Sequence, residues 1–580
     1  MVECQNCGQN TEKPTSVAAK EFRKNRGQIT TGNIDVCERC LGCYTGRKTA
    51  SEKILESKED KRLIVAGPGT GKSHTFGEVL KLLPEGSTAM VFTFINNLVD
   101  ELEKDLAGIE GRDVRVNTLH GFCTQLLYSH GKPEDLKEHF EYFPKLLMLI
   151  EADATLLGFG YSKKILKSSF AQINEGAELK FYLDRGAYYN AVSHDDTVYR
   201  VYDYYRKGGK IPTYTIVVVD EYQDFNPLEA AFIGKLAEKN KILIAGDDDQ
   251  ALYGFRDAST RYIRDLYNGT DFESLPLPYC SRCTPVLVEA TNHFVRQAQK
   301  VGRLSGRIPR DFECYWPDKY SEHDAYPSID VARCSTFGPT ALRYIQQRVV
   351  SISDKEMLTG EEGTLPFMII GPESGFRLDE LKAHLTDTLD PARFEIADSR
   401  HGGESLVIEE GYAILRKGHN KNLGWRIILH ADPLPDAVEI VKATYESDVE
   451  LESLLPDAYK AKHLAALAKT SAETEQEETL YVPKIRILLT NYLGSKGLSA
   501  LHVIVIGLNN YEFPSNPGDV QDAEVCKFVV ALTRAKSSCS LVANRAWDVR
   551  TKKSVDRPSA FISWLPQDKL KTKTYKATDF

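Results

Sequence analysis

The sequence predicts an α/β protein with two blocks, in each of which buried parallel strands alternate with helices. Short apolar runs that end at Gly, Asp or a turn signal predict the strands, at 62–67, 88–94, 215–220, 242–247, 366–371 and 502–507. Helical patterns lie between them, at 97–106, 227–237 and 377–385. The two blocks meet near residue 273, and this alternation is typical of doubly wound sheets.

Both blocks are interrupted by sequence of a different character. The predicted order is a cysteine-rich segment (1–48), a first α/β domain (49–118 and 201–272) with a helical insertion (119–200), a second α/β domain (273–392 and 481–565) with a small mixed accessory insertion and acidic linker (393–480), and a basic tail (566–580). We expect the tail to fray, because it is short, charged and terminal.

Composition limits the class of protein. The chain has 580 residues, 42% hydrophobic and 27% charged, with a net charge of −9. No apolar run approaches the roughly 20 residues that a bilayer span needs, so we expect a soluble protein with no membrane contact. Twelve cysteines without an export signal favour a reducing, cytoplasmic setting. The acidic balance argues against a basic coat for duplex DNA but permits a local positive groove.

The first chemical motif is LIVAGPGTGKS at 63–73, a strand that runs into a glycine-rich loop and then a helix. In this context the pattern predicts a P-loop, whose backbone N–H groups surround a β-phosphate. We expect Lys72 to reach the β- and γ-phosphate oxygens and Ser73 to bind Mg²⁺. Ala66 replaces the first Gly of the general pattern. The predicted nucleotide-binding residues are Gly67, Pro68, Gly69, Thr70, Gly71, Lys72, Ser73 and His74.

Adjacent carboxylates follow a second buried strand in IVVVDEYQD at 216–224. Ligands of open α/β sheets bind at the carboxyl ends of the strands, so these side chains are expected near the P-loop. We expect Asp220 to hold Mg²⁺ through water and Glu221 to act as general base toward an attacking water. The alternative is an acidic turn that caps the next helix.

The N-terminal segment carries Cys4-x2-Cys7 and Cys37-x2-Cys40-x2-Cys43. Paired C-x2-C knuckles predict a four-thiolate zinc site that stabilises a segment too small for its own core. We favour Cys4, Cys7, Cys37 and Cys40 as ligands, with Cys43 as the alternative. An iron–sulfur cluster is the second interpretation. The basic stretch between the knuckles favours contact with nucleic acid over contact with a protein partner.

A series of ordered motifs resembles those of the UvrD/Rep-like superfamily 1 helicases over residues 50–550. The segment IAGDDDQALYGFRDAS (244–259) resembles motif III of that family, and the P-loop and 216–224 precede it. The remaining matches are 92–102 (motif Ia), 118–122 (Ib), 281–292 (IV), 494–508 (V) and 529–536 (VI). The resemblance implies two RecA-like P-loop domains, with ATP or another nucleoside triphosphate as substrate and Mg²⁺ as cofactor.

The resemblance also implies roles for residues outside the P-loop. Gln250 is the implied γ-phosphate sensor, and Arg282 and Arg534 are the implied arginine fingers from the second domain. Phe94, Tyr253 and Phe255 match the family's base-stacking positions, with Phe255 in place of the usual Trp. Core packing is the alternative for each of these aromatic residues. The resemblance also implies contacts to the nucleic-acid strand from Asn96, His120 and Arg256.

Departures from the family pattern gather at one end of the nucleotide. Ser51 replaces the Gln that reads adenine, His74 an Arg beside the base, Ser281 the Tyr that stacks on the base and Ser499 the Glu that contacts the ribose. We therefore predict poor discrimination among ATP, GTP and CTP, with Tyr279 as a possible substitute for the lost stacking. In motif V, Leu493 replaces a His, while Lys496 and Gly497 remain.

Two functions are consistent with these residues. The first is a motor that couples nucleoside-triphosphate hydrolysis to movement along single-stranded DNA, 3′ to 5′ by resemblance, with opening of tailed duplexes; RNA is not excluded. The alternative is a nucleotide-gated clamp or recruiting module, such as the partner of a nuclease, with little unwinding. A protein partner is expected to bind through the N-terminal segment or the accessory insertion.

Overall fold

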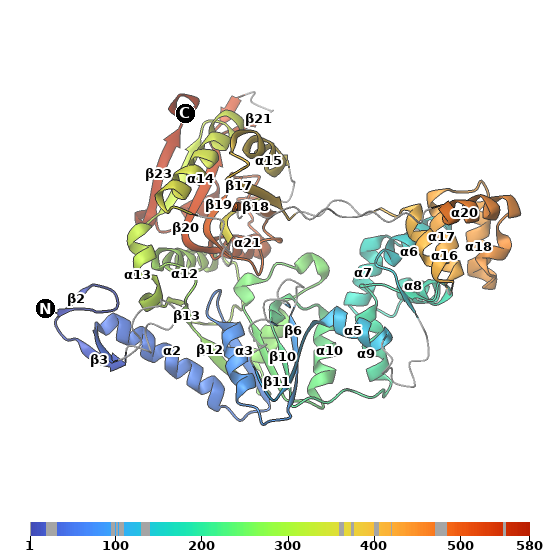
Figure 1. The fold of residues 1–580 in the computed structure, drawn as a ribbon, viewed down its shortest axis with the longest axis horizontal. Coiled ribbons are helices and arrows are strands. Elements are labelled where there is room, and N and C mark those ends of the chain that lie inside the picture. The colour runs from blue at the N-terminus through green and yellow to red at the C-terminus, as the bar shows by residue number, and fades with distance from the viewer. Residues whose placement is uncertain are drawn as a thin grey trace.

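Two large parallel sheets form the body of the protein, and one lies in the upper part and the other in the lower part of Figure 1. This computed structural model describes residues 2–18, 32–93, 99, 103, 109–128, 140–358, 365–372, 376–399, 405–418, 420–469, 484–548 and 553–580. In each sheet all neighbouring strands pair in parallel, as βαβ connections require. The predicted α/β fold class with two parallel sheets is therefore confirmed.

The first sheet has six strands, with the P-loop strand next to one edge. Their order is β12 (Glu273–Leu277), β5 (Lys61–Ala66), β11 (Ile242–Gly246), β10 (Ile216–Val219), β6 (Thr88–Thr93) and β7 (Asp113–Thr118). Helices α3 (Lys72–Lys81) and α10 (Pro227–Ala237) contribute to the cores that cover it. Strand β12 was expected in the second block, but it pairs with β5 and closes the edge of the first sheet.

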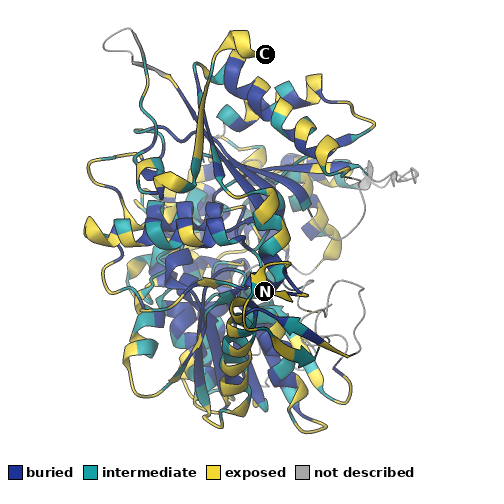
Figure 2. Cartoon of the chain, turned by 90° about the vertical axis from the view of Figure 1, so that its left-hand side faces the viewer, coloured by how far each residue is buried: buried dark blue, intermediate teal, exposed yellow. Residues whose placement is uncertain are grey.

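The second sheet has seven strands. Their order is β17 (Phe394–Asp398), β18 (Ile485–Asn491), β16 (Leu365–Gly371), β19 (Ala500–Val505), β20 (Ala535–Asn544), β15 (Ile329–Cys334) and β23 (Leu570–Tyr575). The helices of this domain include α12 (Pro285–Lys300), α14 (Arg343–Lys355), α15 (Phe376–Thr388) and α21 (Asp522–Leu532). Figure 2 shows the strands of both sheets buried between helices whose outer faces are exposed.

The expectation of a frayed basic tail is wrong for residues 570–575. This stretch is strand β23, which pairs in parallel with β15 along its whole length. The ring of Tyr575 also packs on Tyr344, with centroids 4.9 Å apart, and stacks on Phe580 at 5.7 Å. Backbone pairing and one aromatic anchor are enough to hold an edge strand whose lysines face solvent.

Helices make up most of both insertions. The first contains α5 (Leu119–Tyr128), α6 (Leu146–Leu156), α7 (Lys163–Ala171), α8 (Ala177–Tyr188) and α9 (Thr197–Arg206), with a short strand pair. The second contains α16 (Ile408–Lys417), α17 (Lys421–Ala431), α18 (Ala437–Ser447), α19 (Leu451–Leu454) and α20 (Asp457–Lys469). It was expected to be mixed, but the strand in that range, β17, belongs to the second sheet, and the described residues 405–469 form helices without strands.

The two insertions are joined by a buried ionic cluster. Asp153 of α6 is fully buried and accepts from Arg185 Nε of α8 at 2.8 Å and from Arg426 Nε of α17 at 2.7 Å. The Tyr189 hydroxyl donates to the same carboxylate at 2.6 Å. Figure 1 shows the consequence: α16–α20 lie beside α6 and α8 rather than against the second sheet from which they branch.

The N-terminal segment forms two small antiparallel ribbons, β1 (Val2–Glu3) with β2 (Asn10–Thr11) and β3 (Thr15–Ala18) with β4 (Asn33–Val36), followed by the long helix α2 (Glu38–Glu56). Its small core includes Trp316 of α13 (Trp316–Ala325), which belongs to the second domain. At its other end α2 inserts Ile54 into the core of the first domain. Within the described part of the chain, no helix combines the length and apolarity needed to cross a bilayer.

Candidate active site

The P-loop adopts a conformation that requires its glycines. Gly69 and Gly71 have φ of 67° and 90°, in the left-handed region that residues with a Cβ rarely adopt. A Cβ at Gly69 would also lie 2.3 Å from Cβ of Arg282, so the second domain packs directly on the loop. Thr70 Oγ1 donates to the Gly67 carbonyl at 2.9 Å and closes the turn before α3 begins.

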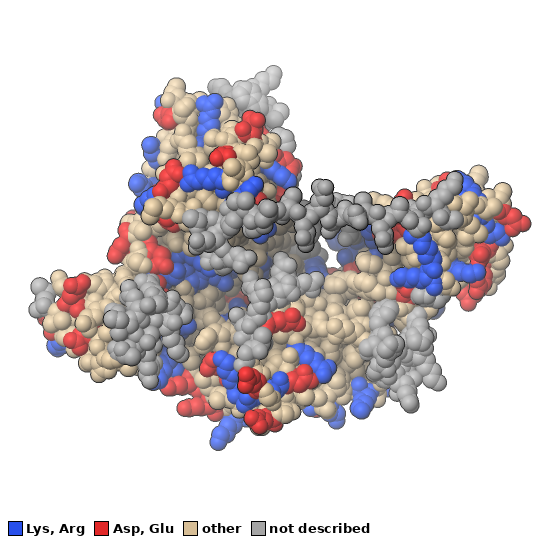
Figure 3. All heavy atoms as spheres, in the orientation of Figure 1, with Lys and Arg blue, Asp and Glu red and all other residues tan. Residues whose placement is uncertain are grey.

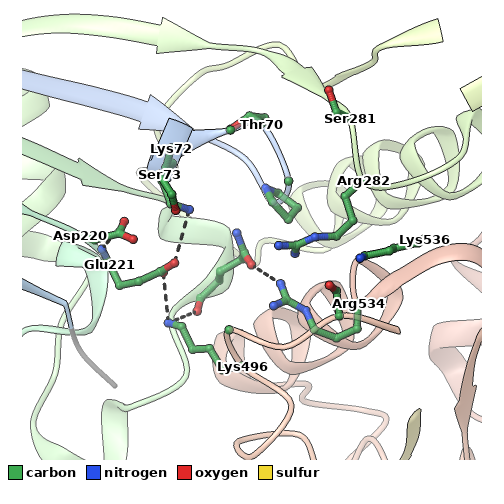
Figure 4. Close-up of a pocket in the computed structure, with 16 residues that line it drawn as sticks. Thr70, Lys72, Ser73, Asp220, Glu221, Ser281, Arg282, Lys496, Arg534 and Lys536 are labelled. Atoms are coloured by element: carbon green, nitrogen blue, oxygen red, sulfur yellow. Dashed lines mark hydrogen bonds and ion pairs between the residues drawn. The ribbon is translucent and has the colours of Figure 1, made fainter. Parts of the chain in front are cut away.

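A cavity of about 380 Å³ lies between the two sheets at this loop. Its size suits a nucleotide. The first domain contributes residues 68–73, Asp220, Glu221 and Gln250. The second contributes Ser281, Arg282, Lys496, Gly497, Ser499, Arg534 and Lys536. The structure thus brings together the predicted catalytic residues at one cavity, and Figure 4 shows the two arginines pointing into it from the second domain.

Glu221 lies between two lysine ammonium groups in the cavity. Lys72 Nζ lies 3.4 Å from its Oε1 and Lys496 Nζ lies 3.6 Å from its Oε2. Burial favours the neutral acid, but the two ammonium groups outweigh it and hold the pKa of Glu221 well below the usual range. At neighbouring Asp220, burial and the charge of Glu221 raise the pKa to about 7. Glu221 also has φ of 54°, a strained backbone typical of functional sites.

Arg534 reaches the first domain through Gln250. Its Nη2 donates to Gln250 Oε1 at 2.7 Å (Figure 4). Gln250 Nε2 in turn donates to Asp247 Oδ2 at 2.7 Å. Burial, reinforced by the nearby charge of Arg282, lowers the pKa of Arg534 to about 9. A buried guanidinium next to a second one favours an anion between them.

Lys496 was recognised in motif V but was not predicted as a site residue. Its ammonium group contacts the buried carboxylate of Asp224 and donates to the Gln250 carbonyl at 3.2 Å. Burial lowers its pKa to about 8. The signal in the sequence was the retained Lys-Gly of motif V.

Motif III contains three buried aspartates that could be mistaken for a metal site, Asp247, Asp248 and Asp249. Arg310, 3% exposed, contacts all three carboxylates, and Arg264 and Arg307 pair with Asp248 and Asp249 at 2.8 Å. Three guanidinium groups thus neutralise the cluster. Nothing in the local sequence identified Arg310, which is 63 residues from Asp247.

The structure describes only some of the residues that are predicted to bind single-stranded nucleic acid. Phe94, Asn96 and the side chain of Phe255 lie outside the described residues. Tyr253 is half-buried, with Lys496 Nζ 5.5 Å from its ring centroid. His120 and Arg256 line a second cavity of about 690 Å³, which is separate from the nucleotide cavity. The ring of His120 stacks on His194 with centroids 3.8 Å apart.

Three lysines that sequence reasoning missed line this second cavity, Lys163, Lys164 and Lys167 of α7. The available signal was the Lys-Lys-x-x-Lys spacing, which places Lys163 and Lys167 on one helix face. Figure 3 shows Lys and Arg side chains gathered in the recess between the two sheet domains, although the net charge is negative.

The cysteine cluster is compact. The Sγ atoms of Cys4, Cys7, Cys37 and Cys40 all lie within 4.8 Å of one another, and all four residues are buried. Backbone N–H of Cys37 donates to Cys4 Sγ at 3.2 Å, and Asn6 Nδ2 donates to Cys40 Sγ at 3.5 Å. Cys43 lies outside this group, and its Sγ faces the Cys314 carbonyl at 3.8 Å.

Comparison with known proteins shows similarity to DNA helicases over part of the chain. Residues 50–256 match the family model described as an AAA domain, AAA_19. The chain is 24% identical to ATP-dependent DNA helicase UvrD1 of Mycobacterium tuberculosis (strain ATCC 25618 / H37Rv) over 305 residues, 43% of this chain and 39% of that protein. It is 23% identical to DNA helicase II of Escherichia coli (strain K12) over 405 residues, 57% of this chain and 54% of the relative.

A third relative matches along most of its length. It is a probable DNA helicase II homolog of Mycoplasma capricolum, 23% identical over an alignment of 634 positions that covers 87% of this chain and 85% of the relative. The chain spans only about half, or less, of the first two relatives. With the ordered motifs and the two parallel sheets, these matches show that the chain, which also carries an N-terminal cysteine cluster, resembles the UvrD/Rep-like superfamily 1 helicases.

Proposed function

We propose that this protein hydrolyses a nucleoside triphosphate and uses the cycle to move along single-stranded DNA, 3′ to 5′, opening tailed duplexes. The observation that carries the proposal is the contact of Arg534 with Gln250, because it joins the two sheets at the mouth of the P-loop. A γ-phosphate at this point would compete for the guanidinium, so closure of the cavity would depend on bound triphosphate. The relatives named as DNA helicases support DNA as the track.

Each residue of the cavity has a proposed role. The P-loop N–H groups and Lys72 bind the phosphates, and Arg282 and Arg534 stabilise charge on the transferring phosphoryl group. Glu221 takes the proton of the attacking water, for which its ionised state is suited. Ser73 and Asp220 line the cavity together and offer oxygen ligands, the kind that Mg²⁺ prefers. When bound, Mg²⁺ neutralises phosphate charge.

The four cysteines are proposed to hold zinc. Four thiolates at about 2.3 Å from one ion stand about 3.8 Å apart in a tetrahedron. The Cys4–Cys40 and Cys7–Cys37 sulfur pairs are separated by 3.9 and 3.8 Å. An iron–sulfur cluster places its thiolates on different iron atoms and therefore farther apart. The donor set thus fits zinc, and a cytoplasmic setting, where thiols stay reduced, is consistent with it.

Hydrolysis of ATP, GTP and CTP, measured with and without single-stranded DNA or RNA, tests the proposal. We expect stimulation by single-stranded DNA and displacement of a strand from a 3′-tailed duplex. Lys72→Ala and Glu221→Gln should abolish both, while Lys81→Ala, on the exposed side of the same helix α3, should change neither. Stimulated hydrolysis without strand movement would instead support the nucleotide-gated clamp.

A further inference from the structure

The base end of the nucleotide cavity is marked by Ser281, which stands where the family has the Tyr that stacks on the base. One side chain from another element contacts this serine. Arg47 of helix α2 donates from Nη1 to Ser281 Oγ at 2.8 Å. Its Nη2 also lies 3.8 Å from the Cβ position of Gly71, at the start of α3. Arg47 therefore stands beside both the P-loop and the expected base position.

The guanidinium of Arg47 rests on an aromatic platform. Its Cζ lies 4.6 Å from the ring centroid of Tyr315, which is 5% exposed. The Arg47 side chain is itself 30% exposed, so solvent still reaches part of it. A planar cation held on one ring is well suited to stack on a second π-system.

Helix α2 is held close enough to the cavity for this role. A Cβ at Gly46 would lie 2.2 Å from the hydroxyl oxygen of Tyr279, so a larger residue there would require the Tyr279 ring to move. The helix is fixed at both ends, by Cys37 and Cys40 in the cysteine cluster and by Ile54 in the core of the first domain. Arg47 is thus placed by a rigid element that is anchored on both sides.

We propose that Arg47 is the base-stacking residue of the nucleotide site, sandwiched between Tyr315 and the base. This inference rests on the proposed nucleotide-binding function and goes beyond it by naming the residue that replaces the lost base contacts. A guanidinium stacks on any base, because every base has a π-face. The replacement would therefore supply affinity without selecting adenine, in agreement with the weak discrimination among nucleotides that the sequence predicts.

A purely structural role for Arg47 predicts something different. Its Nη1 lies 3.9 Å from Asp318 Oδ2 on α13, so the same side chain could serve only to tie α2 to the second domain. That pair is partly exposed, with 30% and 40% of the two side chains accessible, and such pairs contribute little to stability. Asp318→Asn removes this ion pair and leaves the guanidinium on Tyr315, which makes it the matched control.

Calorimetric binding of ADP, GDP, CDP and inorganic pyrophosphate to the full chain, with Mg²⁺ present, tests the proposal. For Arg47→Ala we expect dissociation constants roughly tenfold or more higher for all three nucleotides, with pyrophosphate binding unchanged. Arg47→Lys should resemble Arg47→Ala, because an ammonium group lacks the planar face. Asp318→Asn should bind all four ligands like the parent protein, and melting temperatures should show that every variant is folded.

Other results would overturn the inference. An equal loss of pyrophosphate affinity would make Arg47 a phosphate ligand, and the same nucleotide-specific loss in Asp318→Asn would make it an interdomain tie. If the parent protein binds pyrophosphate as tightly as ADP, the base end contributes nothing and Arg47 has no such role. If the parent protein binds none of the four ligands, the proposed nucleotide site itself fails.

Discussion

The Nη2 of Arg534 lies 2.7 Å from Oε1 of Gln250, and this hydrogen bond spans the cavity between the two parallel sheets. Arg534 sits on the turn between α21 and β20, whereas Gln250 follows β11 of the first sheet. Because Gln250 is also tied to Asp247, and Asp247 to Arg310, the contact belongs to a continuous polar chain through motif III. A ligand that displaces Gln250 from Arg534 can thus alter how the two domains meet.

Arg534→Ala is expected to lower the rate of nucleoside-triphosphate hydrolysis by roughly 10³-fold or more, in line with other arginine fingers. ADP binding should change much less, because the guanidinium acts on the γ-phosphoryl group. Single-turnover hydrolysis and calorimetric ADP binding measure the two effects separately. Retention of a tenth or more of the parent rate would contradict the assignment of Arg534.

Replacing Lys163, Lys164 and Lys167 together by Ala is expected to weaken single-stranded DNA binding and to reduce its salt dependence. Each phosphate contact that is lost lowers the slope of log K against log salt by about 0.7, so three contacts correspond to about 2. Fluorescence anisotropy at several salt concentrations gives both quantities. Lys180→Ala on α8, an exposed lysine that is paired with Asp184, is the control and should leave the slope unchanged.

Metal content should distinguish the four clustered cysteines from Cys43. Cys40→Ser removes a buried thiolate of the four-cysteine cluster, and we expect loss of one equivalent of zinc and a lower melting temperature. Cys43→Ser should keep the metal, because that thiol faces the Cys314 carbonyl instead. Elemental analysis distinguishes these outcomes. Iron in place of zinc, together with visible absorption, would indicate an iron–sulfur cluster instead. Since α2 begins at this cluster, Cys40→Ser should also weaken ADP binding.

The ionic cluster between the insertions should contribute strongly to stability. Asp153→Leu leaves Arg185 and Arg426 buried without their carboxylate, and such a loss typically costs about 3–5 kcal/mol. Asp184→Asn breaks the exposed Lys180–Asp184 pair of α8 and should cost under about 1 kcal/mol. Thermal unfolding and limited proteolysis of the insertions compare the two variants. Similar melting temperatures would show that the insertions do not depend on this cluster.

Local pattern was sufficient for the strands of the first sheet that end at the cavity. The runs IVVV of β10 and ILIAG of β11 are apolar without interruption because both faces of a parallel sheet are covered. The P-loop and the cysteine knuckles could also be predicted from the sequence, because their chemistry depends on the spacing of a few residues along the chain. Strand β12 was misplaced because its sequence, ESLPL, carries a Pro and a charge, as edge strands do.

Long-range contacts were beyond the reach of local pattern. Arg47 and Ser281 are 234 residues apart, and Asp153 and Arg426 are 273 apart. Neither pair has a motif, because each arises only when separate domains pack together. Ser281 and Ser499, where the sequence departs from the family pattern, both line the cavity, but the side chain that we propose for the base end, Arg47, lies on helix α2 and was not singled out in the sequence.

Stability should fall as pH drops below about 6.5, through His120. Burial, followed by the charges of His194, Arg256 and Lys167, holds the pKa of His120 well below its usual value of 6.5. Between the lowered folded pKa and the unfolded value, the unfolded chain binds more protons, so the free energy of unfolding decreases with falling pH by up to about 1.4 kcal/mol per unit. It levels off below the folded pKa. Melting temperatures from pH 7.5 to 5 should show a smaller slope for His120→Asn than for the parent, whereas His74→Asn, at an exposed position, should keep the parent slope. Identical slopes in all three proteins would mean that His120 is not held in its neutral form.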